Sequence, residues 1–229
     1  TLVGIFGIGQ TPKGDKDPFA LRRAAIGLLR IITDKNLDLD IVDLVEIAKT
    51  QYADKLTNDN VVIDVVDFLF ARFRATYQAN GYSVELIQSV LERRPTKPVD
   101  FEKRIKAVAK FQTLPEAAPI AAANKRISNI LAKVTEQISN EVSQDLLQED
   151  AEIALVEILG SLESKLSPLF SSGDYESALF ELASLQTPVD AFFDNVMVMA
   201  DDLAVKNNRL ALLNRLRNLF LQVADVSVL

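Results

Sequence analysis

The sequence predicts an all-α protein. Apolar residues recur at the three- and four-residue spacing of helix faces along nearly the whole chain, and no stretch alternates as a half-buried strand does. The eight glycines and eight prolines fall mostly between these periodic segments, where they end one helix and start the next. With 229 residues and 48% hydrophobic composition, the chain can bury one large core or two smaller ones.

Capping residues indicate where the helices of the first hundred residues begin and end. Asp17-Pro18 places a capping acid before a proline, which is favoured at the first helical position. Asn58 or Asp59 caps a later helix, and Asn80-Gly81 ends it because glycine adopts a positive φ at little cost. The helices predicted in this half run from 17 to 31, 40 to 56, 61 to 79 and 83 to 93.

The second half repeats the same signals. A helix is predicted from Asp100 to Thr113, and a long one follows the Leu114-Pro115 turn. The next helix starts at Asp145 or Asp150 and ends near Pro168, while Asp174 caps another. The helices predicted here run from 100 to 113, 115 to 138, 145 or 150 to 166, 175 to 185, 189 to 195 and 206 to 223.

Two missing residue types exclude several kinds of chemistry. Without cysteine the chain forms no disulfide and no thiolate zinc site. The absence of cysteine favours a reducing, cytoplasmic location. Without histidine it lacks the commonest general base and transition-metal ligand. The GxxxxG spacing of Gly9–Gly14 is followed by Asp15 instead of the lysine of a nucleotide-binding loop. We therefore predict no catalytic residue, metal or cofactor in this chain.

The sequence also limits the membrane and targeting interpretations. No apolar run reaches the roughly 18 residues needed to span a membrane. The most apolar stretch, Val61–Phe70, is interrupted by Asp64 and Asp67. The chain starts at Thr1 with no basic leader and no initiator methionine, so we expect it to be part of a longer protein. Because no apolar run is long enough to span a membrane, we expect no membrane partner.

Positive charge gathers in one segment of an otherwise acidic chain. Residues 91–135 contain ten lysines or arginines and four acids, a net charge of +6 in a chain of net charge −7. Grouped cations create a local field that attracts phosphate. Two successive predicted helices contain most of these cations, which favours RNA binding over the alternative of a solvated charged face. Cationic side chains bind phosphates, and asparagine and arginine also hydrogen-bond to exposed base edges. The candidate RNA-binding residues are Lys103, Arg104, Lys106, Lys110, Asn124, Lys125, Arg126, Asn129, Lys133 and Arg209.

Four segments resemble the C-terminal region of the bacterial glycyl-tRNA synthetase beta subunit family. They are Asp17–Ala25, Phe101–Ile105 with Leu114-Pro115, Ala122–Leu131 and Val205–Leu213. The resemblance covers essentially the whole chain in order. It implies a beta subunit that pairs with a class II alpha subunit in a cytoplasmic heterotetramer. The alpha subunit would hold glycine, ATP and Mg²⁺, while the beta subunit would bind tRNA(Gly) and not DNA.

The same resemblance implies a division into two packed helical bundles. Residues 1–14 would be the tail of a preceding HD-like domain or a connector, residues 15–98 a helical body, and residues 99–229 an anticodon-binding domain of the DALR type. Lysines and arginines of the candidate set would hold the anticodon stem, and Asn124, Arg126, Asn129 or Arg209 would contact unpaired bases. This chain alone would be non-catalytic within glycine–tRNA ligase. A helical scaffold without RNA contact is the remaining alternative.

Overall fold

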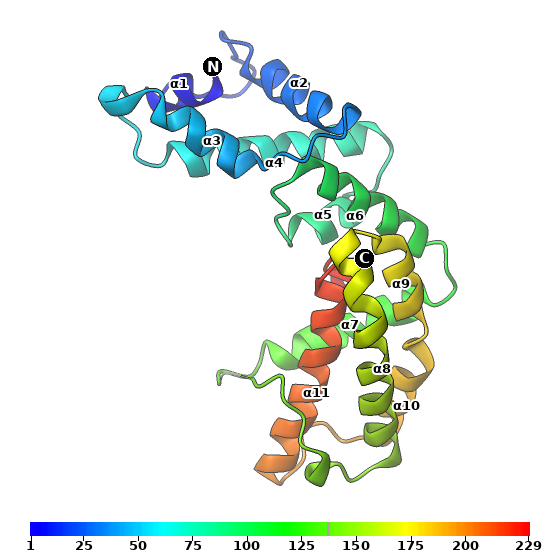
Figure 1. The fold of residues 1–229 in the computed structure, drawn as a ribbon. Coiled ribbons are helices and arrows are strands. Elements are labelled where there is room, and N and C mark those ends of the chain that lie inside the picture. The colour runs from blue at the N-terminus through cyan, green and yellow to red at the C-terminus, as the bar shows by residue number, and fades with distance from the viewer. Residues whose placement is uncertain (137) are drawn as a thin grey trace. The chain divides into compact units, whose positions relative to one another are not determined.

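A computed structural model describes residues 1–136 and 138–229, and every regular element in this part of the chain is helical (Figure 1). The only β-type pairing there is an isolated bridge between Lys13 and Lys16. The all-α prediction is confirmed. The chain divides into two compact units, residues 1–102 and 103–229. The predicted domain assignments of segments 1–14, 15–98 and 99–229 stay predictions.

In the first unit, the other helices pack around α4. This long helix contacts α1, α2, α3 and α5, and its buried stripe includes Val65, Leu69 and Phe73. The Phe73 ring stacks on Phe101 with centroids 4.4 Å apart, so the first turns of α6 belong to this core. The helices of this unit are α1 (Leu2–Gly7), α2 (Leu21–Asp34), α3 (Ile41–Thr50), α4 (Val61–Ala79), α5 (Val84–Leu91) and the start of α6 (Pro98–Phe111).

Helix α1 was not predicted from the sequence. Gly4 and Gly7 give this segment a low helix propensity, but they also allow close packing. A Cβ atom on Gly7 would clash with the Leu56 side chain, and one on Gly4 would lie 2.6 Å from the Tyr52 hydroxyl. The Gly7 carbonyl accepts a hydrogen bond from the Thr57 amide at 2.8 Å. Contacts within the first unit therefore offset the low propensity.

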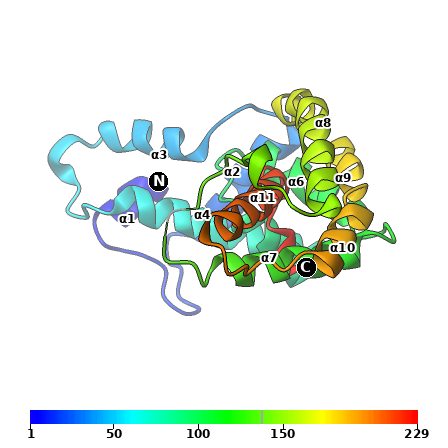
Figure 2. The same cartoon turned by 90° about the horizontal axis from the view of Figure 1, so that it is seen from below.

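The second unit is a bundle in which α11 contacts both α7 and α8 (Figure 2). Helix α8 also packs on α9 and α10, and the short turn 226–228 packs on α7. Leu159, Phe192, Leu213 and Phe220 lie in the core. The helices of this unit are the rest of α6, then α7 (Ala117–Leu131), α8 (Asp150–Ser172), α9 (Tyr175–Ala183), α10 (Gln186–Asn195) and α11 (Leu203–Leu221).

Several predicted boundaries differ from the observed ones, and the helix predicted to reach Leu56, α3, ends at Thr50. Helix α2 begins at Leu21, because Asp17 accepts the Leu21 and Arg22 amides from outside the helix. Helix α7 ends at Leu131, seven residues before the predicted end. Helix α8 continues past Pro168, which removes one backbone donor, and ends at Gly173 with a φ of +71°. Gln137, which fell in the predicted long helix, lies outside the described residues.

Replacing the buried Leu159 of α8 with alanine tests the core of the second unit. We expect Leu159→Ala to lower the free energy of unfolding by about 2–5 kcal/mol, because it removes buried methyl groups and leaves a cavity. Ile153→Ala on the same helix is the matched control. Its side chain is 41% exposed, so a loss below about 1 kcal/mol is expected. Urea unfolding gives both values, and equal losses would contradict this core assignment.

Candidate nucleic-acid interface

Helix α7 and the turn that follows it present a polar, cationic face to solvent. Lys125, Arg126, Asn129 and Lys133 are all exposed. At about 100° per residue, Lys125, Arg126 and Asn129 fall within a quarter to a third of the circumference of α7, and Lys133 lies in the turn that follows the helix. Among the described residues, none of the three cations has a carboxylate partner. This group, called the α7 face below, therefore keeps its full positive charge.

Arg126 is held in place without being neutralised. Its guanidinium carbon lies 4.1 Å from the centroid of the Phe193 ring on α10. A guanidinium over an aromatic face is attracted by the negative face of the ring, and the contact uses none of the edge N–H donors. The stacking restrains the side chain and leaves its donors available for phosphate or a base edge.

Three of the four cations predicted on α6 are lysines at the surface, and the fourth, Arg104, is bound internally. Lys103, Lys106 and Lys110 are exposed and share one side of the helix by their spacing. Lys110 forms an ion pair with Glu176 on α9, which reduces its availability. The α6 lysines therefore supply weaker local charge than their number indicates.

Arg104 has a structural position, which corrects its assignment to an RNA surface. Its guanidinium donates to the carbonyls of Gln222 and Val223 at 2.6 and 2.7 Å and to the Tyr175 hydroxyl at 2.8 Å. Carbonyls at a helix C-terminus lack partners within the helix. Arg104 satisfies two of them after α11 and thereby fastens α6 to α11 and α9.

Asn124 also differs from its prediction, because it is only 1% exposed. It lies on the buried side of α7 with Ile120 and Ile127, and its Nδ2 donates to the Ile120 carbonyl at 3.1 Å. Its Oδ1 has no hydrogen-bond partner within the described residues. Asn124 does not face a ligand. The spacing from Ile120 to Ile127 was the sequence signal that placed it inside.

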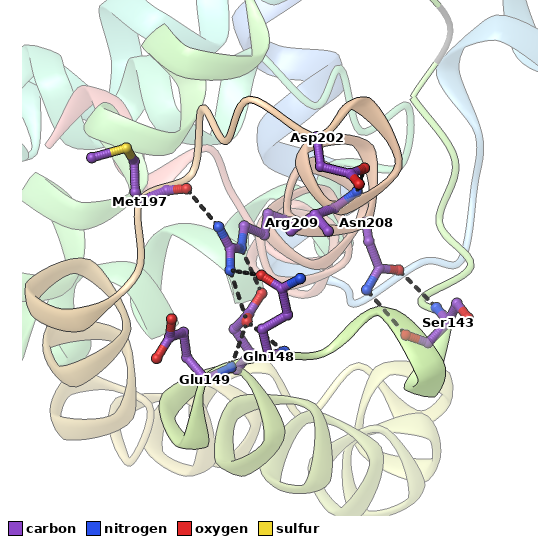
Figure 3. A network of polar contacts seen from close by, with 9 residues as sticks. Ser143, Gln148, Glu149, Met197, Asp202, Asn208 and Arg209 are labelled. Carbon is purple, nitrogen blue, oxygen red and sulfur yellow. Dashed lines mark hydrogen bonds and ion pairs between the residues drawn. The ribbon is translucent and has the colours of Figure 1, made fainter.

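Arg209 was predicted to contact a base, and the structure corrects this as well. Its side chain is 5% exposed and forms a two-bonded ion pair with Glu152 of α8. The Nε–Oε1 distance is 2.8 Å and the Nη2–Oε2 distance is 3.2 Å, while Nη1 donates to the Met197 carbonyl at 2.9 Å (Figure 3). All three nitrogens have partners in the interior, so Arg209 cannot contact RNA in this structure.

Glu152 is fixed from both sides. Its Oε2 accepts the amides of Gln148 and Glu149 at 3.0 and 2.9 Å, which caps the start of α8. Burial raises the pKa of Glu152, but hydrogen bonds from Arg209 and from these amides outweigh that effect and hold its pKa below the ordinary value. The hydrogen bond to Glu152 in turn raises the pKa of Arg209. The pair is therefore ionised at neutral pH.

The other arginines of α11 also have carboxylate partners. Arg215 makes two bonds of 2.6 Å to Glu163. Arg217 makes bonds of 3.1 and 2.7 Å to Asp225. Neighbouring Asn208 exchanges two hydrogen bonds with the backbone of Ser143 (Figure 3). Helix α11 is thus a structural element whose three arginines are paired within the unit.

Comparison with known proteins assigns these two units to a family. Residues 1–92 match the model described as glycyl-tRNA synthetase beta subunit, and residues 120–226 match the DALR anticodon binding domain. Over all 229 residues, the chain is 83% identical to the glycine–tRNA ligase beta subunit of Psychromonas ingrahamii. The chain belongs to the glycyl-tRNA synthetase beta subunit family. The resemblance stated from the sequence is confirmed.

Two further relatives are the glycine–tRNA ligase beta subunits of Aeromonas salmonicida, 62% identical, and Aeromonas hydrophila, 61% identical. Each alignment covers 100% of this chain and 33% of the relative, so the chain spans about a third of the length of these proteins. The DALR match includes the α7 face and excludes the α6 lysines.

Within the described residues, no helix is long and apolar enough to cross a membrane, and no cluster of acidic side chains could hold a metal ion.

The Glu152–Arg209 pair predicts how acid affects stability. The pKa of Glu152 in the folded state lies below its ordinary value of 4.5, so the unfolded state binds more protons as pH falls. The stabilisation is complete above that value and is lost as pH falls through the folded pKa. We expect the urea midpoint of the wild type to drop more than that of Glu152→Gln between pH 7 and roughly pH 3.

Glu157→Gln is the control, because Glu157 is exposed on the same helix. This variant should retain the acid sensitivity of the wild type. An equal loss of stability in the wild type and in Glu152→Gln would show that the pair has no linkage to protons.

Proposed function

We propose that the second unit binds the anticodon arm of a glycine tRNA through the α7 face, as part of glycine–tRNA ligase. The observation that supports this most directly is the position of Lys125, Arg126, Asn129 and Lys133. They form one exposed face, have no carboxylate partners among the described residues, and lie inside the region that matches an anticodon binding domain.

The distribution of charge in the second unit supports the same surface. Residues 103–135 contain seven lysines or arginines and one acid, whereas residues 136–229 contain five and sixteen. Phosphate is attracted to the first segment and repelled by the second. Helices α8, α9 and α10 belong to the acidic part, so RNA approaches the bundle from the side of α7.

Each residue of the α7 face has a role that fits its chemistry. The flexible side chains of Lys125 and Lys133 neutralise backbone phosphates as point charges. Arg126, restrained by Phe193, and Asn129, about one turn further on, offer hydrogen bonds to unpaired bases. Each good base contact contributes roughly 1–3 kcal/mol of discrimination.

In this proposal glycine activation takes place elsewhere in the enzyme. An alpha subunit would bind glycine, ATP and Mg²⁺, and this chain would position the tRNA without a catalytic residue or cofactor of its own. The absence of cysteine supports a cytoplasmic location for this work.

A second function, association with a partner subunit, is supported by a separate surface. Met197 is 75% exposed and Met199 is also largely exposed on the segment that connects α10 to α11, and the exposed Leu203 is the first residue of α11. Grouped exposed apolar side chains are typical of protein contacts. Asp201 and Asp202 lie in the same segment and disfavour RNA there. This apolar segment is a candidate contact for the alpha subunit.

Charge reversal on the α7 face tests RNA binding. We expect Lys125→Glu/Arg126→Glu to weaken binding of a glycine anticodon stem-loop by at least about tenfold, because attraction becomes repulsion. The slope of log affinity against log salt should fall by about 0.7 for each phosphate that the variant no longer neutralises. Fluorescence anisotropy at two salt concentrations measures both quantities.

Lys165→Glu is the matched control, since it reverses an exposed lysine on α8 in the acidic part of the same unit. It should leave stem-loop affinity nearly unchanged. Unchanged affinity in the α7 double variant, with helicity preserved, would exclude the α7 face as the binding site.

An activity measurement tests the assignment of chemistry to another subunit. Mixed with glycine and ATP, the 229-residue chain alone is expected to form no glycyl adenylate, because the proposed active site lies in another subunit. Pyrophosphate exchange measures this step. Exchange above the buffer background would overturn the assignment.

A further inference from the structure

Three arginines line one groove of the first unit, which the anticodon proposal does not use. The groove lies along α4 and α5 and has a volume of about 590 Å³. Arg72 and Arg74 lie on α4, and Arg94 approaches from the residues that follow α5. Phe70 and Leu91 add apolar surface to the same lining. This site is called the arginine groove below.

The guanidinium of Arg72 is positioned but not satisfied. Its carbon lies 5.2 Å from the centroid of the Phe68 ring, and its buried Nε has no hydrogen-bond partner within the described residues. A buried polar atom without a partner costs free energy, and such atoms are rare unless a ligand or water completes them. Arg72 therefore lacks the internal hydrogen-bond partner that most buried donors have.

Of the two other guanidiniums, that of Arg74 keeps its charge, whereas that of Arg94 has a carboxylate partner. Arg74 is exposed and donates to the neutral side-chain amide of Gln88. Arg94 stacks 4.9 Å from the Phe70 centroid and forms an exposed ion pair with Asp67, which reduces its availability as Glu176 reduces that of Lys110. Glu92 is the one acid in the groove lining. The lining thus has three cations and one acid.

This arrangement differs from that of the arginines in α11. Arg209, Arg215 and Arg217 each make two hydrogen bonds to a carboxylate of the same unit. In the groove, Arg72 stacks on the Phe68 ring and Arg74 donates to the Gln88 amide, while Arg94 pairs with Asp67. Since a guanidinium has five donors, each groove arginine has donors left for an external anion. Stacked arginines are also pre-oriented for two-point contact with phosphate.

We propose that the arginine groove binds backbone phosphates of the tRNA, outside the anticodon stem-loop. Arg72 and Arg74, with Arg94 beside them, suit a ligand that has anionic groups in a row, and an RNA strand supplies one per nucleotide. The groove lies mainly in residues 1–92, which match the beta-subunit model, and not in the anticodon binding match. The inference rests on the proposed function, because it takes the RNA bound by the α7 face as the source of these phosphates.

The experiment compares two RNAs on the full 229-residue chain. A complete glycine tRNA transcript is titrated beside its isolated anticodon stem-loop, by anisotropy at two salt concentrations. Arg72→Gln/Arg74→Gln should weaken tRNA binding at least about fivefold and lower the salt slope by roughly 0.7–0.9 for each phosphate no longer neutralised. Stem-loop binding should stay unchanged. Arg30→Gln on α2 is the control, because Arg30 is an exposed arginine of the same unit paired with Asp34.

Because Arg72 is partly buried, its substitution could weaken binding by unfolding the chain. A second variant, at an exposed arginine only, separates the two effects. Arg74→Glu changes an exposed side chain, so its melting temperature should match that of the wild type, and it should show the same selective loss. Unchanged tRNA affinity and salt slope in a folded Arg74→Glu chain would overturn the inference and leave an acidic protein segment as the alternative ligand. An equal loss for both RNAs would overturn it too.

The two proposals fail separately. If the groove variants have no effect while Lys125→Glu/Arg126→Glu weakens both RNAs, the groove is excluded and anticodon binding stands. If reversal of the α7 face changes neither affinity, the anticodon proposal fails whatever the groove variants do.

Discussion

The buried ion pair between Arg209 and Glu152 joins the start of α8, the first turns of α11 and the segment before α11 (Figure 3). A buried charge is tolerated only when its hydrogen-bonding groups all have partners, and loss of one partner costs about 3–5 kcal/mol. Glu152 meets this condition through Arg209 and two backbone amides. Arg209 meets it through Glu152 and the Met197 carbonyl. Because the carbonyl belongs to Met197, the pair also fixes the backbone from which the exposed Met197 side chain projects.

Internal pairing decides how much of the positive charge in the sequence acts on a ligand. Residues 91–135 have a net charge of +6, yet Arg94, Lys97 and Lys110 pair with Asp67, Asp38 and Glu176. Arg104 is occupied by backbone carbonyls. In the described part of the second unit, α7 retains a group of exposed cations without carboxylate partners. Charge segregation in the sequence thus identified this region, while the usable surface is smaller than the charge count indicates.

The sequence predicted the helical class, most helices and several caps, because these depend on local spacing and on single residues. Asp174, for example, caps α9 as predicted, by accepting the Ser177 amide at 3.2 Å. The site residues that were wrong depend on distant partners. Glu152 lies 57 positions before Arg209, and no local pattern pairs them. Asn124 was a different error: its spacing from Ile120 and Ile127 marks the buried side of α7, but its residue type was given more weight than its position.

Arginines in this chain are restrained in two ways that have opposite consequences for binding. A carboxylate partner fixes the guanidinium and cancels its charge, as in Arg209, Arg215 and Arg217. An aromatic ring fixes it and leaves the charge intact, as in Arg126 on Phe193 and Arg72 on Phe68. Stacking alone is not sufficient, since Arg104 lies 4.3 Å from the Tyr175 centroid but donates to backbone carbonyls. Both proposed phosphate sites therefore rest on an arginine that is stacked and still has unused donors, and not on the local count of positive residues alone.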